Sequence, residues 1–131
     1  MILFFDRTVG KEIPIALKDH LKPPDLQIEY HQEHFPHDMP DDDWLPLVGK
    51  WGWTVIGQDY SYHLKSPEVQ AIIDFKVGAF YLWGSEAPRW ETMRAFARGY
   101  DNILKRAAVT PTPFVFRIEK HGGATELYVM P

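Results

Sequence analysis

The sequence predicts an α/β fold in which helices cover both faces of a mainly parallel sheet. Short apolar runs alternate with stretches of helical periodicity along most of the chain, and the end of the chain has a two-strand pattern around paired glycines. The 131 residues contain no internal repeat or linker, which fits one domain over residues 1–131. We therefore expect a three-layer α/β/α sandwich with a C-terminal antiparallel hairpin.

The first part of the chain alternates strand and helix patterns. The uninterrupted apolar run Ile2–Phe5 predicts a strand that is buried on both faces. Apolar residues at helical spacing predict a helix over Val9–Leu21. Leu26–Tyr30 alternates apolar and polar residues, so we expect a half-exposed strand beside the first. His31–Pro40 has no periodicity, which predicts a loop.

The middle of the chain repeats this order. Asp41 is expected to cap a helix that ends at Gly52. The strands that follow are Trp53–Ile56 and Ala79–Trp83, with a helix at Pro67–Lys76 between them. The residues that the helix after Asp41 is expected to bury are Trp44, Leu45, Val48 and Trp51.

The longest helix and the hairpin complete the chain. The helix is expected to begin at Pro88, where a proline is tolerated in the first turn. Its apolar stripe is predicted to contain Trp90, Met93, Ala97, Tyr100, Leu104 and Ala107. Phe114–Glu119 and Glu126–Val129 flank two glycines, which predicts an antiparallel hairpin at a sheet edge.

Composition and charge exclude several classes of function. The absence of cysteine excludes disulfide scaffolds, thiol nucleophiles and Cys-based zinc sites, and it fits a reducing compartment. The apolar runs are too short for a membrane span and the N-terminus lacks a signal-peptide pattern, so we expect a cytoplasmic protein with no membrane partner. With a net charge of −4, an RNA partner would need a local basic patch or metal ions.

Acidic residues follow two of the apolar strands. Asp6 and Asp59 stand directly after strand patterns, and the carboxyl ends of neighbouring parallel strands lie at one edge of a sheet. Asp41, Asp42 and Asp43, at a helix start, could reach the same crevice. Crowded carboxylates repel each other unless their pKa values rise or cations bind, and oxygen ligands suit Mg²⁺ or Mn²⁺. Each aspartate alone could equally be a turn former or a helix cap.

Four segments resemble the PIN-like domains that are grouped with VapC-type toxins. They are Phe4-Phe5-Asp6-Arg7, His31-Gln32-Glu33-His34-Phe35-Pro36, Pro40-Asp41-Asp42-Asp43-Trp44, and Gly52-Trp53-Thr54-Val55-Ile56 leading to Asp59. The resemblance covers roughly Met1 to Phe116. It implies an α/β/α domain that cleaves RNA in a metal-dependent reaction.

The resemblance also implies site residues and partners. Asp6, Asp41 or its neighbour Asp42, and Asp59 correspond to the acidic positions that hold Mg²⁺ or Mn²⁺ for phosphodiester hydrolysis. A toxin of this kind implies a cognate antitoxin protein. The candidate substrate-binding residues are Arg7, His34, Arg94 and Arg98, although the two helical arginines could also form a solvated face.

The sequence departs from the family at one acidic position. PIN domains usually carry a fourth acid shortly after the position of Asp59, whereas Tyr60, Ser61, Tyr62 and His63 stand here. Asp74 is expected to lie on a solvated helix face instead. A PIN-like module that binds RNA without cutting it therefore stays an alternative.

Four further interpretations come from other patterns. Asp59 could be the acceptor of a receiver-like phosphoacceptor domain, although receivers end in a helix. His31, His34 and His37 stand at three-residue steps that could indicate zinc, but the loop setting argues against convergence. A homodimer contact could bury one of the large aromatic residues, and Tyr60, Tyr62 and Trp83 could stack on bases near strand ends.

Overall fold

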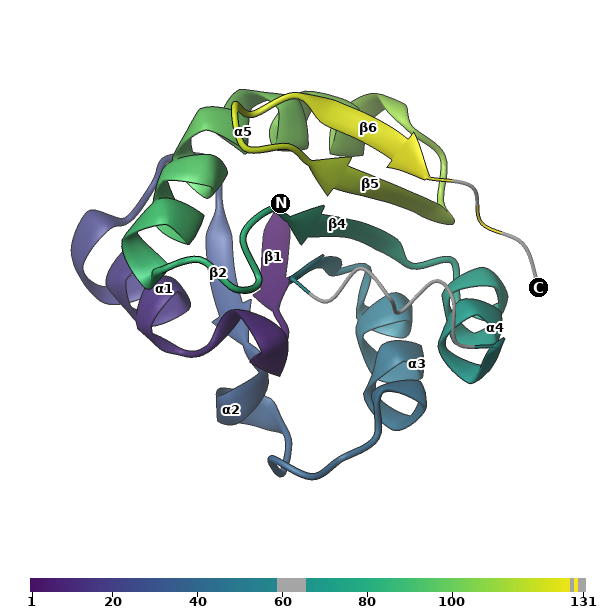
Figure 1. Ribbon diagram of the computed structural model, residues 1–131. Coiled ribbons are helices and arrows are strands. Elements are labelled where there is room, and N and C mark those ends of the chain that lie inside the picture. The colour runs from purple at the N-terminus through teal and green to yellow at the C-terminus, as the bar shows by residue number, and fades with distance from the viewer. Residues whose placement is uncertain (59–65, 128, 130–131) are drawn as a thin grey trace.

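Six strands form one sheet in the order β2-β1-β3-β4-β5-β6 in the computed structural model, which describes residues 1–58, 66–127 and 129 (Figure 1). The strands are β1 (Ile2–Phe5), β2 (Gln27–Tyr30), β3 (Thr54–Gly57), β4 (Gly78–Leu82), β5 (Phe114–Ile118) and β6 (Ala124–Leu127). Strands β1 to β5 are parallel, and β6 pairs antiparallel with β5. The predicted fold class is confirmed.

Helices cover both faces of the sheet. Their bounds are α1 (Glu12–Ile15), α2 (His31–His34), α3 (Asp41–Trp51), α4 (Ser66–Asp74) and α5 (Arg89–Val109), with a 3₁₀ turn η1 (Arg7–Val9) and a π-helix η2 (Ala16–Leu21). Helices α3 and α4 lie on one face, and α1 and α5 lie on the other (Figure 1). Within the part of the chain that the structure describes, no helix combines the length and the hydropathy needed to cross a membrane.

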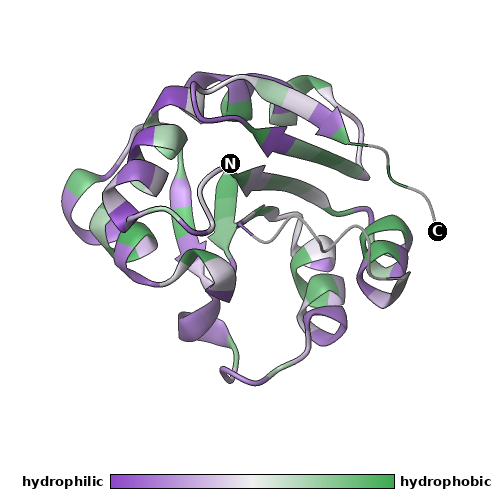
Figure 2. Ribbon diagram, viewed as in Figure 1, coloured by the Kyte–Doolittle hydropathy of each residue, from purple (hydrophilic) through white to green (hydrophobic). Residues whose placement is uncertain are grey.

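The apolar run of β1 serves two cores at once. Leu3 and Phe5 pack on the α5 side together with Phe96, whereas Phe4 packs on the α3 side against Trp44. All four of these aromatic side chains are at most 2% exposed. Because side chains alternate between the faces of a strand, a central strand covered on both faces must be apolar throughout, and Figure 2 shows β1 in green, the hydrophobic colour.

The predicted helix Val9–Leu21 is divided into three short pieces. Gly10, whose φ is +81°, interrupts the chain between η1 and α1. In η2 the backbone hydrogen bonds span five residues instead of the four of an α-helix. The backbone N–H of Lys22, for example, donates to the carbonyl of Leu17 at 2.7 Å. The predicted loop His31–Pro40 likewise contains one short helix, α2.

The start of α3 differs from the prediction at Asp41. The N-cap is Pro40, and Asp41 is the first helical residue, so its side chain does not cap the helix. Its Oδ1 instead accepts a hydrogen bond of 3.0 Å from the indole N–H of buried Trp44. Trp51 was expected to be buried but is 46% exposed. The helix ends as predicted at Gly52, with a φ of +73°.

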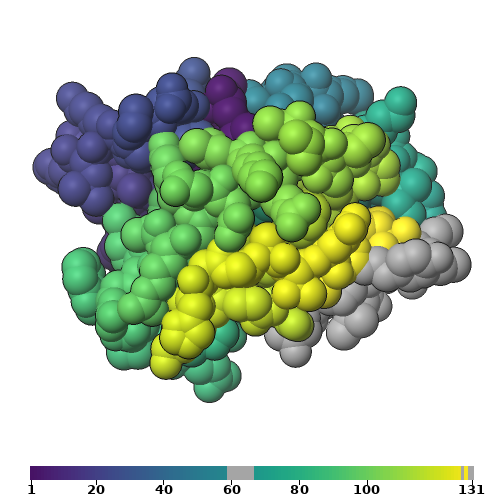
Figure 3. Space-filling view, turned by 90° about the horizontal axis from the view of Figure 1, so that it is seen from above, coloured from purple at the N-terminus to yellow at the C-terminus, as the bar shows by residue number. Residues whose placement is uncertain are grey.

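The buried stripe of α5 is rotated relative to the prediction, although Met93, Tyr100 and Ala107 of the predicted stripe pack against the core as partly buried residues. Trp90 was expected in the core but is 70% exposed. The buried residues of this helix are Thr92, Ala95, Phe96, Gly99 and Ile103. Small residues lie inward because the β5–β6 hairpin packs closely on the helix (Figure 3): a Cβ on Gly99 would lie 2.6 Å from a methyl group of Ile118.

Phe96 and Trp90 form a matched pair for testing this orientation. Phe96→Ala should lower the free energy of unfolding by about 3–5 kcal/mol, because it leaves a cavity in the core. Trp90→Ala should change it by about 0.5 kcal/mol or less, because the ring is mostly in water. Urea denaturation measures both values, and equal losses in the two variants would contradict the observed burial.

Candidate acidic site at the carboxyl edge of the sheet

Asp6 lies at the point where the chain changes direction across the sheet. From β1 the chain passes to β2 on one side and later to β3 on the other, and the carboxyl ends of strands at such a point are where open α/β sheets bind ligands. The backbone N–H of Asp6 donates to the carbonyl of Ile56 at 2.9 Å, which fixes the residue beside the end of β3. Its side chain is 0% exposed.

Thr8 holds the Asp6 carboxylate and joins the two strand ends. The backbone N–H of Thr8 donates to Asp6 Oδ1 at 2.8 Å, and its hydroxyl donates to the same oxygen. The Thr8 hydroxyl in turn accepts a 3.0 Å hydrogen bond from the backbone N–H of Gln58. One threonine therefore links the segment after β1 to the segment after β3.

Gly57 provides the space beside the other oxygen of Asp6. A Cβ at this position would lie 2.6 Å from Asp6 Oδ2 and 3.1 Å from the ring of Tyr81. A Cβ contact of 2.6 Å is shorter than real Cβ atoms show. Because Gly57 has no side chain, the Asp6 carboxylate can lie against the backbone of β3. The cradle around Asp6 thus depends on a glycine at the end of the neighbouring strand.

Arg7 connects the Asp6 segment with the start of α3. Its guanidinium donates to the carbonyls of His37 at 2.5 Å and Met39 at 2.7 Å, and it lies 3.5 Å from Asp41 Oδ1. Asp41 is 8% exposed, so both of its partners, Arg7 and Trp44, compensate a largely buried carboxylate. Asp6 and Asp41 therefore stand at the same edge of the sheet.

The remaining predicted acids have different positions. Asp42 follows Asp41 on α3, and its side chain is exposed to solvent. Asp59 lies outside the described residues, directly after Gln58. Asp74 is exposed on α4 and accepts a 2.7 Å hydrogen bond from Gln70, in agreement with the expected solvated face.

Gln58, Thr92 and Arg89 form a polar group that the sequence patterns did not reveal. The side-chain amide of Gln58, which is 2% exposed, donates to the Thr92 hydroxyl at 3.0 Å. The guanidinium of Arg89 donates to the amide oxygen of Gln58 at 3.5 Å. This group ties the end of β3 to the first turn of α5 and brings an exposed arginine beside the acidic edge. The signal available in the sequence was a polar residue, Gln58, directly after an apolar strand.

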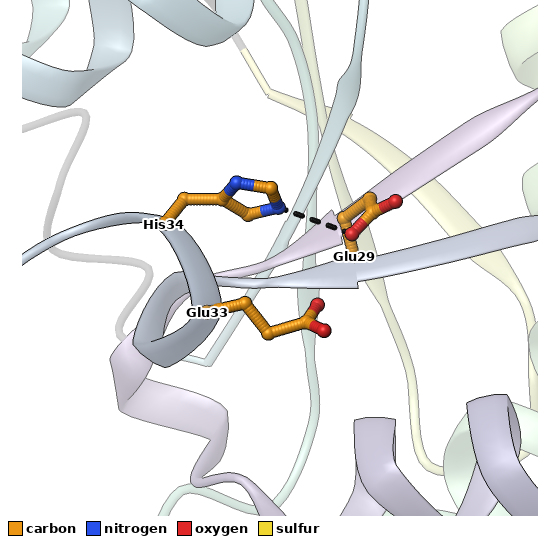
Figure 4. A group of neighbouring side chains, drawn as sticks. All are labelled: Glu29, Glu33 and His34. Carbon is orange, nitrogen blue, oxygen red and sulfur yellow. Dashed lines mark hydrogen bonds and ion pairs between the residues drawn. The ribbon is translucent and has the colours of Figure 1, made fainter.

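His34 belongs to a second charged cluster at the edge strand β2. Figure 4 shows its ring turned toward Glu29, and Nε2 lies 3.0 Å from Glu29 Oε2. Glu29, Glu33 and His34 are, within the described ranges, the one group of three or more potential metal ligands whose atoms lie within 4.8 Å of one another. Lys18 occupies the same cluster, with its ammonium 3.2 Å from Glu29 and 2.8 Å from Glu33. A cation bound there would have to displace this ammonium.

The charges of this cluster shift pKa values in opposite directions. Burial alone would raise the pKa of Glu29, but hydrogen bonds from Gln27, His34 and Lys18 lower it to about 2. Burial works against the charge of Lys18, yet its hydrogen bonds to Glu33 and Glu29 raise its pKa above the usual value. The cluster is thus an ion-pair network that holds α2 against β2.

The three histidines of the predicted loop do not share a site among the described residues. His31 is fully buried between the rings of Phe4, Phe35 and Trp44, and burial followed by the charge of Arg7 lowers its pKa. His34 faces Glu29, and the carbonyl of His37 binds Arg7. Only His34 belongs to a group with the geometry of a metal site.

Arg94 and Arg98 lie on the exposed face of α5. Arg94 pairs with Glu91 one turn earlier at 3.1 Å, and Arg98 donates to the carbonyl of Lys120 at 3.5 Å. Arg98 thus lies against the turn between β5 and β6. Their role as RNA contacts stays a prediction.

Fold and site together define the chain as a doubly wound α/β protein with buried acids at the carboxyl edge of its sheet. A family model described as a PIN like domain matches residues 1–84. The chain belongs to the PIN-like domain family, as the resemblance of its motifs predicted. PIN-like domains form a nuclease-type superfamily, which favours nuclease chemistry over the receiver-like alternative. No curated protein and no solved structure gives a significant match.

The Thr8 bridge yields a stability prediction. Thr8→Val keeps the shape of the side chain but removes the hydroxyl that serves Asp6 and Gln58. We expect it to lower the free energy of unfolding by about 1–3 kcal/mol, because buried polar groups lose a partner. Chemical denaturation measures this loss. Thr8→Ser keeps the hydroxyl and should retain most of the stability; a serine variant as unstable as the valine variant would contradict the bridge.

The Lys18 cluster yields a pH prediction. Because the folded-state pKa of Glu29 is about 2 against 4.5 unfolded, its ion pairs stabilise the fold fully above pH 4.5 and are lost as the pH falls toward 2. Lys18→Met should therefore cost about 1 kcal/mol or less at pH 7. The difference from wild type should shrink below pH 4.5.

Urea unfolding at several pH values tests the Lys18 prediction. Lys105→Met, at an exposed position of α5, is the matched control and should show no such pH-dependent difference. A Lys18→Met difference that stays constant down to pH 2.5 would show that Lys18 does not act through Glu29.

Proposed function

We propose that this protein is a Mg²⁺- or Mn²⁺-dependent endoribonuclease of the toxin–antitoxin type that hydrolyses RNA phosphodiester bonds at a carboxylate cluster. The observation that carries the proposal is the buried Asp6 carboxylate at the carboxyl end of β1, with Asp41 at the same edge, in a PIN-like chain. Asp59 completes the proposed ligand set, and Asp42 is the neighbour that could replace or assist Asp41.

The described residues fit a hard divalent cation. Asp6 and Asp41 offer carboxylate oxygens, which Mg²⁺ and Mn²⁺ prefer, and Gly57 lets the Asp6 carboxylate lie against the end of β3. A cation held there would neutralise phosphate charge and lower the pKa of a bound water. The protein's part is orientation: Thr8 fixes Asp6 Oδ1, and Arg7 with Trp44 fixes Asp41.

Cationic side chains near the acids are the proposed RNA contacts. Arg89 is exposed beside Gln58, whose amide oxygen lies 3.5 Å from its guanidinium, and it can approach a phosphate from solvent. Arg7 is held by two carbonyls and Asp41, so its proposed contribution is a fixed positive charge near the substrate. His34, Arg94 and Arg98 stay in the proposal as more distant contacts. The toxin type implies a cognate antitoxin as a partner, and the aromatic-rich sequence supports a homodimer as the second proposed partner.

Asp6→Asn is the direct test of this function. The purified protein should cut a mixed pool of labelled single-stranded RNA with Mn²⁺ or Mg²⁺ and should not cut it with a chelator. Asn keeps an oxygen that accepts hydrogen bonds from Thr8 but has no negative charge. Loss of a residue that only supports a metal ligand typically lowers activity roughly 10- to 100-fold, so we expect the cleavage rate of Asp6→Asn to fall further than that. Asp43→Asn, exposed on α3, is the matched control and should cut normally.

A second readout separates binding from catalysis. Electron paramagnetic resonance of Mn²⁺ should show binding that Asp6→Asn and Asp59→Asn weaken and Asp43→Asn does not. Metal and RNA binding without cleavage would support the inactive binding module instead. Unchanged cleavage in both Asp6→Asn and Asp59→Asn would refute the proposed metal site.

A further inference from the structure

A pocket of about 460 Å³ opens at the carboxyl ends of β4 and β5. Its lining residues include Tyr81 and Trp83, from β4 and its extension, and Arg117 from β5. The turn Gly84–Ala87 forms its rim, and Gln58 lies at the end nearest β3. This pocket has no role in the function proposed above.

The pocket lies on the same face of the sheet as the Asp6 carboxylate. In β4, Phe80 and Leu82 belong to the core on the α5 side, so Tyr81 between them faces the α3 side. Arg117 is the register partner of Tyr81 on β5 and faces the same way. The pocket is therefore built on the sheet face that carries the acidic edge.

The pocket and the acidic site share a wall. The ring of Tyr81 and Oδ2 of Asp6 both lie against Gly57. They are 3.1 and 2.6 Å from the position that a Cβ would have on this residue. Gln58 is one of the lining residues and donates its backbone N–H to the Thr8 hydroxyl, and Thr8 holds Asp6. If one group of a ligand were bound at Asp6, the adjacent group of the same ligand would thus lie at the mouth of the pocket.

The chemistry of the lining selects a flat, neutral ligand. Trp83 offers an aromatic face, and the ammonium of Lys120 lies 5.2 Å from the centre of its ring. The guanidinium of Arg117 is paired with Glu119 at 2.7 Å, and Glu86 adds an acid to the lining. Because the positive charge is already compensated, a phosphate is disfavoured there, whereas a nucleobase can stack and form hydrogen bonds at its edge.

We propose that this pocket binds the base of the nucleotide next to the scissile phosphate, with Trp83 as the stacking residue and Arg117 at the base edge. The inference rests on the proposed ribonuclease function for the identity of its ligand. It makes the Tyr81–Trp83–Arg117 pocket the part of the protein that sets base preference in single-stranded RNA.

Nucleoside binding tests the pocket without cleavage. Adenosine, guanosine, cytidine and uridine are titrated into the ¹⁵N-labelled protein, and the indole N–H signal of Trp83, assigned from its loss in Trp83→Phe, is followed by NMR. At least one nucleoside should shift this signal to saturation, while ribose 5-phosphate should not. Trp83→Ala should weaken that binding by at least about fivefold. Trp90→Ala, on an exposed ring outside the pocket, should not.

Two outcomes would overturn the inference. One is that no nucleoside shifts the Trp83 signal, or that ribose 5-phosphate shifts it equally. The other is that N-acetyltyrosinamide binds as tightly as the best nucleoside, which would identify a site for aromatic peptide side chains. Thermal denaturation of Trp83→Ala and Trp83→Phe shows whether each variant is folded, and the wild-type titration decides the matter even where a variant is not.

The failure of this inference is distinguishable from failure of the proposed function. Asp6→Asn leaves the pocket lining intact, so nucleoside binding should persist in it. Binding that depends on Trp83, in a protein that cuts no RNA, would refute the nuclease and support the pocket. Cleavage that depends on Asp6 but has the same base preference in wild type and Trp83→Ala would refute the pocket alone.

Discussion

A fully buried carboxylate at the end of a hydrophobic strand is the constraint on which the site depends. Removing the Asp6 carboxylate from water is costly unless hydrogen bonds replace the lost solvation. Thr8 supplies two donors from the turn that follows β1, and Gly57 lets the group approach the backbone of β3. The same threonine binds Gln58, so solvation of one charge also fixes the relative position of two strand ends.

The same constraint explains how a distant segment reaches this edge. Asp41 is also largely buried, and its compensation comes from Trp44 on its own helix and from Arg7 beside Asp6. Arg7 further binds two carbonyls of the segment that precedes α3. One arginine therefore positions an approach to α3 that has little regular structure of its own. The acids are held by the protein before any ligand arrives, which is the preorganisation that an electrostatic site requires.

Local patterns were sufficient to predict the fold but only part of the site. Strands and helices were predicted because their periodicity lies within a few neighbouring residues, and Asp6 was proposed as a site residue because it follows an apolar strand. The bridge between Gln58 and Thr92 joins residues 34 positions apart, so no local pattern contains it. The rotation of the α5 stripe escaped prediction because close packing on the hairpin selects glycine and alanine inward, whereas hydrophobicity alone favours the large ring of Trp90. Asp59 remains a prediction from the sequence.

The two outer strands of the sheet also determine how copies of this protein can meet. β2 and β6 are four residues each, and both present charged side chains, Glu29 with its Lys18 partner on one and Glu126 on the other. Short, charged edges disfavour the addition of a strand from another molecule, because pairing would bring a foreign backbone against solvated charges. Continuous growth of the sheet from copy to copy is thereby opposed at both ends.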